Sequence, residues 1–336
     1  GVSTSWLAHA ERYVGEMVAR FGLDAGSRVV EVAANDGYLL QYVKARGIAC
    51  TGVEPTASTA AAARAKGIEI VQDFFGRRLA ADMASRGLQA DLMAANNVLA
   101  HVPDINDFAA GFATLLKPRG VATFEFPHLL RLMADAQFDT IYHEHFSYLS
   151  LTAVQRVFEA AGLQVFDVQE LTTHGGSLRV FAQRADTALH PVAPAAGAML
   201  QREIDAGVRT AAYYQGLQPR AERIRDDLLR FLREAKREGR SVVAYGAAAK
   251  GNTLLNFAGV GNDLIRCVVD LNPAKQGKFM PGSRIPIVGP DALRQSRPDL
   301  LFVLPWNILA EVREQNAELR REGTQFVTAI PELRVL

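Results

Sequence analysis

Cysteine is scarce in this sequence of 336 residues, and no apolar run is long enough to cross a membrane. The two cysteines, Cys50 and Cys267, lie inside apolar runs, so we expect buried thiols in a reducing compartment. A membrane span requires roughly 18 consecutive apolar residues. The first residues also lack the basic-then-apolar layout of a secretion signal. Together these absences predict a cytoplasmic protein with no part in a membrane.

An excess of one charge is also missing. Lysine and arginine total 37, and aspartate and glutamate total 36. This balance provides no extended positive field that would hold a polyanion, so we expect no nucleic acid partner. Any phosphate recognition must then be local, through a few lysines or through the N-terminus of a helix.

The composition that remains is that of a globular protein, with 49% hydrophobic and 22% charged residues. The chain is too long for one ordinary hydrophobic core, so two domains are expected. Segment 190–194 is rich in proline and alanine, as linkers are, and a charged helical pattern follows over about 197–238. We therefore predict an α/β domain over 1–185, a linker and long helix over 186–238, and a smaller α/β domain over 239–336.

β-rich and helical runs alternate in the first of these domains. Apolar spacing predicts a helix over 6–21 at its start. Further strands are expected at 28–34, 48–54, 68–71, 91–95 and 121–126, helices at 56–66 and in the segment that ends at 46, and a closing helix and two strands at 151–161, 164–171 and 177–183. This alternation predicts a Rossmann-like parallel sheet with helices on both faces.

Two segments depart from the alternation. Segment 127–150 is rich in aromatic, histidine and acidic residues, which predicts an insertion over the strand ends. Segment 117–120, Lys-Pro-Arg-Gly, predicts a turn before the fifth strand. The second domain begins with a strand over 241–246, and further strands are expected at 265–269 and 300–304. We expect a second Rossmann-like unit there.

Small and acidic residues gather where the first strands end. Glu31 closes the first strand, and the turn after it contains Ala33, Asn35 and Gly37. Ligands of doubly wound sheets bind near this turn, where small residues allow close approach of the backbone. Glu54 closes the second strand, where a carboxylate can accept hydrogen bonds from two ribose hydroxyls. The pattern predicts a nucleotide-type cofactor.

The next two strand ends supply more polar groups. Asp73 offers an acceptor for an adenine amino group, with the aromatic Phe74 beside it, and Asn96 and Asn97 close the fourth strand. An NAD site also has an acid after its second strand. Glu31, placed to face a cationic aminocarboxypropyl group, and the turn at 117–120 favour S-adenosylmethionine over NAD.

The densest cluster of proton-transfer groups is 142–146, Tyr-His-Glu-His-Phe. In an extended segment Tyr142, Glu144 and Phe146 would point one way, and His143 and His145 the other. Two histidines at this spacing suit a metal, but no third and fourth ligand is evident. A general base is favoured because histidine accepts protons near neutral pH, although histidines that simply fix a loop remain an alternative, above all for His143.

Two further histidines are candidates for the same chemistry. His101 follows the asparagines at the end of the fourth strand, so it faces the cofactor crevice or caps the helix that starts near Asp104. His174 opens the run His-Gly-Gly-Ser, which ends at Ser177 between the two closing strands. This run is either a simple hairpin turn or a turn that approaches a substrate.

Eight stretches resemble a known family, the S-adenosylmethionine-dependent sugar C-methyltransferases that act on nucleotide-linked 4-keto deoxysugars. They are 31–37 (EVAANDG), 52–55 (GVEP), 96–101 (NNVLAH), 138–145 (FDTIYHEH), 174–179 (HGGSLR), 245–252 (YGAAAKGN), 270–286 and 304–307 (LPWN), in order over nearly the whole chain. The runs at 142–145 and 245–251 are far more specific than any nucleotide-binding turn.

The resemblance implies S-adenosylmethionine as methyl donor, S-adenosylhomocysteine as product, and Pro55 as an additional cofactor residue. It implies that His145 removes a proton next to a ketone and that Tyr142, Glu144 and His101 position the sugar and stabilise the developing oxyanion. The nucleoside diphosphate would be held largely by the second domain. The substrate-binding residues are then His143, His174, Ser177, Tyr245, Gly246, Lys250, Asn252, Lys275 and Lys278, the last two being solvated loop charges in the alternative interpretation.

One feature departs from the family. Its members usually begin with a cysteine-rich zinc domain and a tyrosine-containing segment, whereas this sequence opens at 1–5 with Gly-Val-Ser-Thr-Ser. Two cysteines cannot form a four-ligand zinc site, so we expect no metal in this chain. The sequence is then either an N-terminal truncation or a member of a zinc-free branch.

Three other functions are compatible with parts of the sequence. An O- or N-methyltransferase would not explain a second nucleotide-binding unit. An NAD-dependent dehydrogenase or epimerase predicts a Tyr-x-x-x-Lys pair, which the first domain lacks. A module that binds a nucleotide sugar without turning it over would bind ligands and form no product. We expect a small-molecule substrate and a monomer or homodimer.

Overall fold

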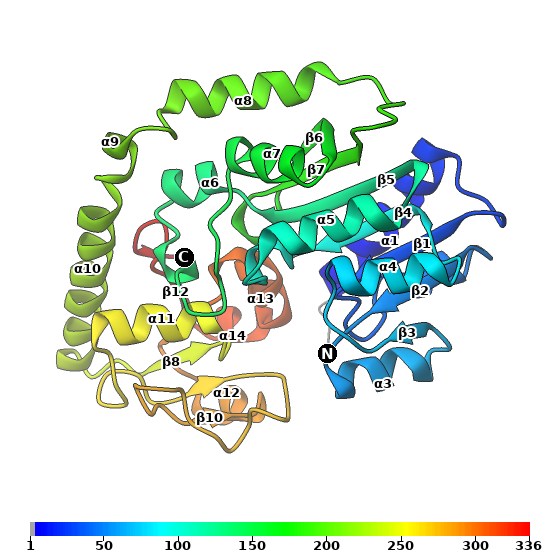
Figure 1. Ribbon diagram of the computed structural model, residues 1–336. Helices are drawn as coiled ribbons and strands as arrows, with labels where there is room; N and C mark the ends of the chain where they lie inside the picture. The colour runs from blue at the N-terminus through cyan, green and yellow to red at the C-terminus, as the bar shows by residue number, and fades with distance from the viewer. Residues whose placement is uncertain (1–3) are drawn as a thin grey trace. The chain divides into compact units, whose positions relative to one another are not determined.

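The computed structural model describes residues 4–336, so the first three residues of the predicted first domain lie outside it (Figure 1). The chain forms two compact units. The first comprises 4–129, 146–172 and 176–208, and the second comprises 130–145, 173–175 and 209–336. Neither unit is continuous in sequence. Much of the insertion predicted in the first domain belongs to the second unit.

Within the described residues, the first unit holds a seven-stranded sheet in the order β3-β2-β1-β4-β5-β7-β6. Its strands are β1 (Arg28–Val32), β2 (Ala49–Val53), β3 (Glu69–Val71), β4 (Ala90–Asn96), β5 (Leu116–Pro127), β6 (Leu163–Leu171) and β7 (Ser177–Arg184). The strands from β3 to β5 in sheet order are parallel, and β7 runs antiparallel to β5 and β6. The predicted Rossmann-like fold is confirmed.

Helices cover both faces of this sheet. They are α1 (Thr4–Phe21), α2 (Leu40–Lys44), α3 (Ala57–Ala65), α4 (Arg77–Ser85), α5 (Ile105–Leu115), α7 (Leu151–Ala160) and α8 (Pro194–Ala206), and α6 (Leu129–Ala134) follows β5. Successive side chains of a strand point to opposite faces. Phe124 of β5 lies 4.5 Å in ring centroid distance from Phe112 of α5 and also from Phe158 of α7. Thr123 bonds to Tyr13 of α1 on the other face.

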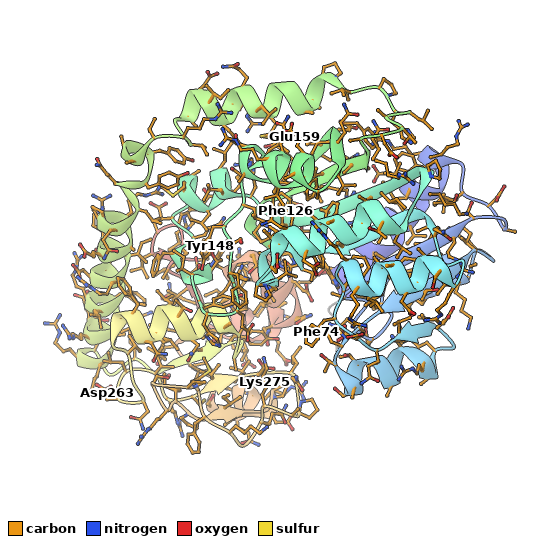
Figure 2. All side chains as sticks on the ribbon, in the orientation of Figure 1. Phe74, Phe126, Tyr148, Glu159, Asp263 and Lys275 are labelled. Carbon is orange, nitrogen blue, oxygen red and sulfur yellow. The ribbon has the colours of Figure 1, made fainter. Side chains whose placement is uncertain are left out.

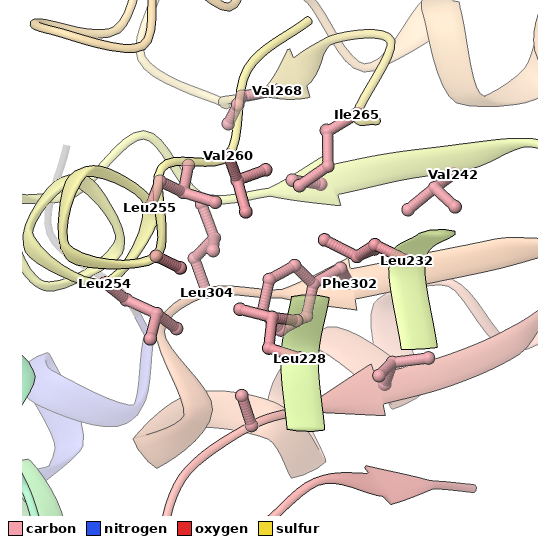
Figure 3. Packing of buried hydrophobic residues seen from close by; sticks show 14 of the residues in the cluster. Leu228, Leu232, Val242, Leu254, Leu255, Val260, Ile265, Val268, Phe302 and Leu304 are labelled. Atoms are coloured by element: carbon pink, nitrogen blue, oxygen red, sulfur yellow. The ribbon is translucent and has the colours of Figure 1, made fainter. Parts of the chain in front are cut away.

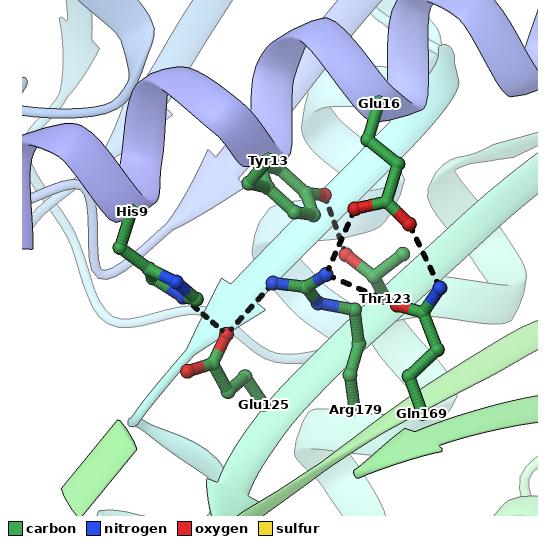
Figure 4. A network of polar contacts seen from close by, with 7 residues as sticks. All are labelled: His9, Tyr13, Glu16, Thr123, Glu125, Gln169 and Arg179. Carbon is green, nitrogen blue, oxygen red and sulfur yellow. Dashed lines mark hydrogen bonds and ion pairs between the residues drawn. The ribbon is translucent and has the colours of Figure 1, made fainter. Parts of the chain in front are cut away.

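A buried polar network joins α1 to β5 and β7 (Figure 4). The hydroxyls of Tyr13 and Thr123 lie 2.6 Å apart. Glu125 is fully buried, and its Oε2 lies 3.0 Å from His9 Nε2 and 3.1 Å from an Arg179 guanidinium nitrogen. Removing one partner of such a buried pair costs about 3–5 kcal/mol. Glu125 is therefore a buried carboxylate that pairs with the guanidinium of Arg179.

Within the described residues, the second unit holds a six-stranded sheet in the order β10-β9-β8-β11-β12-β13. Its strands are β8 (Val242–Tyr245), β9 (Val268–Val269), β10 (Ile287–Val288), β11 (Leu300–Val303), β12 (Gln325–Thr328) and β13 (Arg334–Val335), and its helices are α9 (Ala211–Tyr214), α10 (Leu217–Arg237), α11 (Ala249–Ala258), α12 (Asp291–Ser296), α13 (Leu309–Gln315) and α14 (Ala317–Arg321). Neighbouring strands are parallel except β12 and β13. This order, with β8 beside the point where the order reverses, is that of a dinucleotide-binding sheet.

The core of the second unit lies between its sheet and the helices α10 and α11 (Figure 3). Leu228 and Leu232 of α10 are at most 1% exposed and point toward Phe302 of β11. Leu254 and Leu255 of α11 belong to the same cluster. Burying each such side chain contributes roughly 1.5–3 kcal/mol, so α11 is held firmly at the position where β8 ends.

The single long helix predicted over about 197–238 is wrong. Helix α8 ends at Ala206, because Gly207 adopts a left-handed conformation with φ 89° and donates hydrogen bonds to the carbonyls of Glu203 and Ile204. A left-handed glycine is a common helix C-cap. The short α9 and the separate α10 follow.

Other differences are local. The predicted turn at 117–120 lies inside β5, where the register with β4 shifts between Ala90 and Leu92, so it is a bulge. The strand predicted at 265–269 is reduced to β9. Helix α4, whose nine residues lie between β3 and β4, was not predicted.

Candidate active site

The turn after β1 has the backbone of a glycine-rich loop, although Gly37 is its only glycine. Ala33, Asn35 and Gly37 have φ values of 60°, 52° and 74°. A Cβ on Gly37 would approach Ile68 Cδ1 to 2.4 Å, so this position requires glycine. Non-glycine residues with positive φ cost about 1–3 kcal/mol each and gather at functional sites. The turn thus keeps a conformation that brings backbone close to a ligand.

Glu31 is fully buried at the end of β1. Its carboxylate oxygens accept no hydrogen bond of ordinary geometry from the described residues, although the Tyr38 hydroxyl lies close. Burial raises the pKa of Glu31 well above its usual range, and the charges of Asp36 and Glu54 raise it further. Asn96 Oδ1 and Asp36 Oδ1 are also buried and accept no hydrogen bond from residues 4–336. Such acceptors fit a ligand that brings ammonium N–H groups and a positive charge.

Glu54 differs from Glu31 in having partners. Its Oε2 accepts a hydrogen bond of 2.9 Å from the Asn35 N–H, and its Oε1 accepts one of 2.9 Å from the Thr56 N–H, across Pro55. Each carboxylate oxygen has a second lone pair. Glu54 is therefore oriented by the backbone and can still accept hydrogen bonds from two hydroxyls, as predicted for a ribose.

The residues after β3 are more exposed. Asp73 pairs with Arg78 at 2.5 Å, and this hydrogen bond lowers the pKa of Asp73. Such surface pairs contribute about 0–1 kcal/mol, so the pair can open for a ligand. Phe74 is 78% exposed on the loop between β3 and α4 (Figure 2). An aromatic ring left in water beside a polar acceptor suits an adenine ring.

Asn97 and His101 follow β4. Asn97 has φ 56°, and its N–H donates to the Glu125 carbonyl at 2.7 Å. His101 ends a 3₁₀ turn that begins at Leu99 and is half-buried. Helix α5 is capped by Asp104, whose side chain accepts from the Asp107 N–H, so the helix N-cap is not His101.

In the second unit, segment 142–145 is a turn rather than an extended segment. The His145 N–H donates to the Tyr142 carbonyl at 2.9 Å, and the two rings lie against each other with centroids 4.2 Å apart and planes tilted by 31°. The prediction that Tyr142 and His145 point in opposite directions is therefore wrong. His143 and Glu144 lie at the exposed tip. The turn pairs the candidate base with an aromatic phenol.

The imidazole of His145 is held by the backbone of its own segment. Its Nδ1 lies 2.7 Å from the Thr140 carbonyl oxygen. A carbonyl only accepts, so Nδ1 carries the proton, and in the neutral ring Nε2 is then the nitrogen with the lone pair. This is the tautomer that a general base using Nε2 requires.

The turn after β8 has the spacing of a dinucleotide fingerprint, with Gly246 and Gly251 in the first and third glycine positions and Ala248 in the second. Gly246 has φ 91°, and a Cβ on it would approach Pro305 Cδ to 2.5 Å. A Cβ on Gly251 would lie 2.7 Å from Leu304 Cβ. Ala248 is the N-cap of α11 and has no acceptor for the first amides. These amides are suited to an anion.

Lys250 lies in the first turn of α11. Its Nζ is 3.2 Å from Asn307 Oδ1 and 4.6 Å from the centroid of the Trp306 ring. Burial lowers the pKa of Lys250, and the charge of Asp139 opposes that shift. A partly desolvated ammonium beside uncapped amides is suited to a phosphate.

Asp270 ends β9 and bonds to the same turn. Its Oδ2 accepts from the Ala247 N–H, and its Oδ1 accepts from the Asn272 N–H, both at 2.8 Å. Lys275 donates to the Ala247 carbonyl at 2.7 Å and lies 3.6 Å from Asp270 Oδ2. Lys275 therefore contacts the turn, whereas the Lys278 side chain is exposed.

Four other predicted substrate residues lie in two places. Tyr245 and Asn252 belong to the second sheet and its helix α11, and His174 and Ser177 lie where β6 connects to β7. Tyr245 lines a cavity of about 500 Å³ with Leu271, and burial raises the pKa of its hydroxyl. Asn252 Oδ1 is buried in α11 without a partner among the described residues. Ser177 is buried at the start of β7, opposite Leu171 of β6. The run that begins at His174, with φ 53°, is the predicted turn between these strands.

Asp139 and Trp306 of this region were not selected as site residues from the sequence. Asp139 is fully buried, and its Oδ2 accepts a hydrogen bond of 2.8 Å from Trp306 Nε1. Burial raises the pKa of Asp139 to about 6, although Lys250 and Trp306 lower it. An aspartate inside an otherwise apolar stretch before the histidine cluster was the available signal. Burial of that aspartate depends on contacts distant in sequence.

Comparison with known proteins supplies the family. A model described as "Methyltransferase domain" matches residues 6–168, and one described as "C-methyltransferase C-terminal domain" matches 172–331. C-methyltransferase NovU of Streptomyces niveus is 37% identical over 332 residues, which cover 99% of this chain and 79% of NovU. The chain belongs to the C-methyltransferase family. This C-methyltransferase is thus an S-adenosylmethionine-dependent enzyme, as its sequence predicted.

Solved structures resemble about half of the C-methyltransferase. Magnesium protoporphyrin IX methyltransferase ChlM from Synechocystis PCC 6803, with bound SAH, is 14% identical at a TM-score of 0.43, covering 55% of this chain and 89% of that one. Protein PH0226 from Pyrococcus horikoshii OT3 is 12% identical at 0.43, covering 54% and 92%. Because both TM-scores are below 0.5, the fold is assigned from the strand order of the sheet and not from these similarities.

Two features of the C-methyltransferase concern membranes and metals. Within residues 4–336, no helix is both long and apolar enough to cross a membrane. Over the same range, no three histidine, cysteine, aspartate or glutamate side chains gather as metal ligands. The expectations of a metal-free chain and of a monomer or homodimer stay predictions.

Proposed function

We propose that this C-methyltransferase transfers a methyl group from S-adenosylmethionine to the ring carbon next to the ketone of a nucleotide-linked 4-keto-6-deoxysugar. The observation that carries the proposal is the second nucleotide-type turn, Gly246 to Gly251, with Lys250 beside uncapped helix amides. A methyltransferase needs one such turn for its donor. A second turn, with a cation in place of a buried acid, suits a diphosphate on the acceptor.

In the first unit, the residues proposed to hold the donor are Glu31, Ala33, Asn35, Gly37, Glu54, Pro55, Asp73, Phe74, Asn96 and Asn97. The orphaned oxygens of Glu31 and Asn96 would accept hydrogen bonds from its ammonium group. Glu54 would bind the ribose hydroxyls, and Phe74 would cover the adenine. When bound, S-adenosylmethionine supplies an electrophilic methyl group on its sulfonium.

In the second unit, His145 is the proposed general base. Its Nε2 would take the proton from the carbon next to the ketone, since the Thr140 carbonyl fixes the proton on Nδ1. The electron pair of the broken C–H bond then forms an enolate, whose carbon becomes the nucleophile. Tyr142, whose ring lies against that of His145, is proposed to donate its hydroxyl proton toward the developing oxyanion. Glu144 and, from the first unit, His101 are proposed to position the sugar.

The first experiment is calorimetric titration with S-adenosylhomocysteine, followed by thymidine, cytidine and guanosine diphosphates added to the saturated protein. We expect one site for S-adenosylhomocysteine and one for a nucleoside diphosphate. A screen of keto-sugar nucleotides would then identify the acceptor. Methylation of an oxygen or nitrogen acceptor only, or binding without any product, would contradict the proposal.

The base is tested by His145→Ala. Loss of general base catalysis is expected to lower turnover about 10²–10⁴-fold while S-adenosylhomocysteine still binds. The matched control is His190→Ala, which removes a half-buried imidazole that stacks on Phe166. This variant should keep near-wild-type turnover. Near-wild-type turnover by His145→Ala would assign the base elsewhere.

A further inference from the structure

Trp306 connects three segments of the second unit. Its Nε1–H donates to Asp139 Oδ2 at 2.8 Å, and the Lys250 ammonium lies 4.6 Å from its ring centroid. A Cβ added to Gly175 would approach its Cη2 to 2.2 Å, so the indole edge lies directly against the backbone of the 173–175 turn. The indole is thus fixed from three sides, and its one hydrogen-bond donor is used on Asp139.

Asp139 occupies an unusual position for a carboxylate. It is 0% exposed, and none of the described residues donates to its Oδ1. The positive charge of Lys250 lowers the pKa of Asp139 and so partly offsets the effect of burial. A buried carboxyl group with an unsatisfied oxygen costs about 1–3 kcal/mol or more. Asparagine or an apolar residue would cost less, so stability alone does not account for this aspartate.

The backbone next to Asp139 leads directly to His145. Asp139 is the middle residue of the 3₁₀ turn Phe138–Thr140, and the next carbonyl, that of Thr140, accepts the hydrogen bond from His145 Nδ1. The Thr140 hydroxyl donates to the Gln137 carbonyl at 2.7 Å, and Gln137 Nε2 donates to the Gly175 carbonyl at 2.8 Å. The position of the Thr140 carbonyl is therefore set by the contacts of this turn.

We propose that Asp139 and Trp306 are positioning residues for His145, because their hydrogen bond fixes the turn whose carbonyl orients the imidazole. The proposal rests on the proposed role of His145 as base. Without the Asp139–Trp306 hydrogen bond, the turn shifts and the Nδ1–H tautomer loses its acceptor. A population of His145 then carries its proton on Nε2, where it cannot act as a base.

The test uses a matched set of variants. Asp139→Asn keeps the shape and an acceptor for the indole N–H, whereas Asp139→Ala removes the acceptor. Trp306→Phe keeps an aromatic ring beside Lys250 and Gly175 but removes the donor. If Asp139→Ala does not fold, Trp306→Phe alone decides. Asp263→Ala, an exposed aspartate between α11 and β9, controls for loss of a carboxylate.

The first readout is the histidine tautomer, measured by ¹⁵N NMR on protein with labelled histidine and no substrate. We expect the His145 Nδ1–H form in the wild type and in Asp139→Asn, and a mixture of tautomers in Asp139→Ala and Trp306→Phe. An unchanged tautomer in both disruptive variants would overturn the proposal. This readout does not depend on turnover, so it holds whatever the reaction proves to be.

The second readout is turnover of the keto-sugar nucleotide across pH. Asp139→Ala and Trp306→Phe should lower kcat about 10–100-fold and move the limb of the pH profile that belongs to the base, with S-adenosylhomocysteine affinity within about twofold. Asp139→Asn should stay within about threefold of wild type. If His145→Ala is inactive but Trp306→Phe is wild type in kcat and profile, the positioning role fails alone. If His145→Ala is active, the proposed base fails instead.

Discussion

Glu54 in the first unit and Asp270 in the second occupy the same position in two copies of one strand–turn–helix arrangement. Each acid closes the strand beside the first strand of its fold, β2 or β9. Each acid accepts one hydrogen bond from an amide of the first turn, that of Asn35 or Ala247. Each also accepts one from the amide of the residue two positions after the acid itself. In each unit, the carboxylate at this position therefore fixes the conformation of the first turn.

The two units differ in the residue near the end of their first strand, β1 or β8. Glu31 pairs in register with Gly52, two residues before Glu54. The residue of β8 at the corresponding place, opposite Val268, is Ala244. The second unit instead has Lys250 at the start of its helix. Under the proposed function, one fold would therefore hold an acidic site and a basic site, and a single buried residue at the strand end would favour a cationic ligand over an anionic one.

Removing the buried acid should have the largest effect. Glu31→Gln deletes the charge that an ammonium group would meet, and truncating a buried charge pair costs about 2–5 kcal/mol. We expect affinity for S-adenosylhomocysteine to fall on the order of 100-fold, measured by calorimetry. Affinity for nucleoside diphosphates should not change, nor should either affinity in the exposed control Glu11→Gln. Equal losses for both ligands would break the comparison.

The second unit also holds a buried acid, and its stability should depend on pH. Burial raises the pKa of Asp139 to about 6, above the unfolded value of about 4. The folded state then binds more protons between these values, so the contribution of Asp139 is fully present below about pH 4 and is lost as pH rises through about 6. Asp139→Asn should remove this loss, roughly 2 kcal/mol, in urea unfolding between pH 4 and 7. Parallel profiles of the two proteins would contradict it.

Removing the cation of the second turn should have a smaller effect, and it should weaken the binding of nucleoside diphosphates rather than that of S-adenosylhomocysteine. Lys250→Met deletes one charged contact to a phosphate, worth about 1.5 kcal/mol. We expect roughly 10-fold weaker binding of nucleoside diphosphates and unchanged binding of S-adenosylhomocysteine. Lys236→Met on the exposed face of α10 serves as control. A variant that binds diphosphates normally would remove Lys250 from the site.

The smallest effect concerns the backbone of the first turn. Ala33 has φ 60°, a left-handed conformation that costs an alanine about 1–2 kcal/mol. Ala33→Gly relieves this strain but loses backbone entropy, so we expect a net gain of about 0.5 kcal/mol in the free energy of unfolding. Ala62→Gly, on an exposed position of α3, should instead lose about 0.5–1 kcal/mol. Urea unfolding of both variants measures the contrast.

Much of the fold could be predicted because its strands are short apolar runs separated by helical periods. Where prediction failed, a single backbone conformation decided the outcome. Gly207 divides the predicted long helix by adopting φ 89°, a choice that one glycine in a charged run does not reveal. Strands β10 and β12 have only 2 and 4 residues and gain stability from neighbours distant in sequence.

The candidate site was predictable to the extent that its chemistry depends on residue types at strand ends. Glu31 and Glu54 could be selected in this way, and Lys250 by its place in a glycine-flanked turn. The sequence did not reveal that 142–145 would turn, since it contains no glycine, proline or asparagine. It also could not show that Asp139 meets Trp306, because 167 positions separate the two residues.

The discontinuity of the two units limits how relatives of this enzyme can be recombined. The chain passes between units after residues 129, 145, 172, 175 and 208. A chimera made at one crossover near 208 would take Trp306 from one parent and Asp139 from the other. If the second unit binds the acceptor, as proposed, a transplant of acceptor specificity would have to include three separate pieces: 130–145, 173–175 and 209–336.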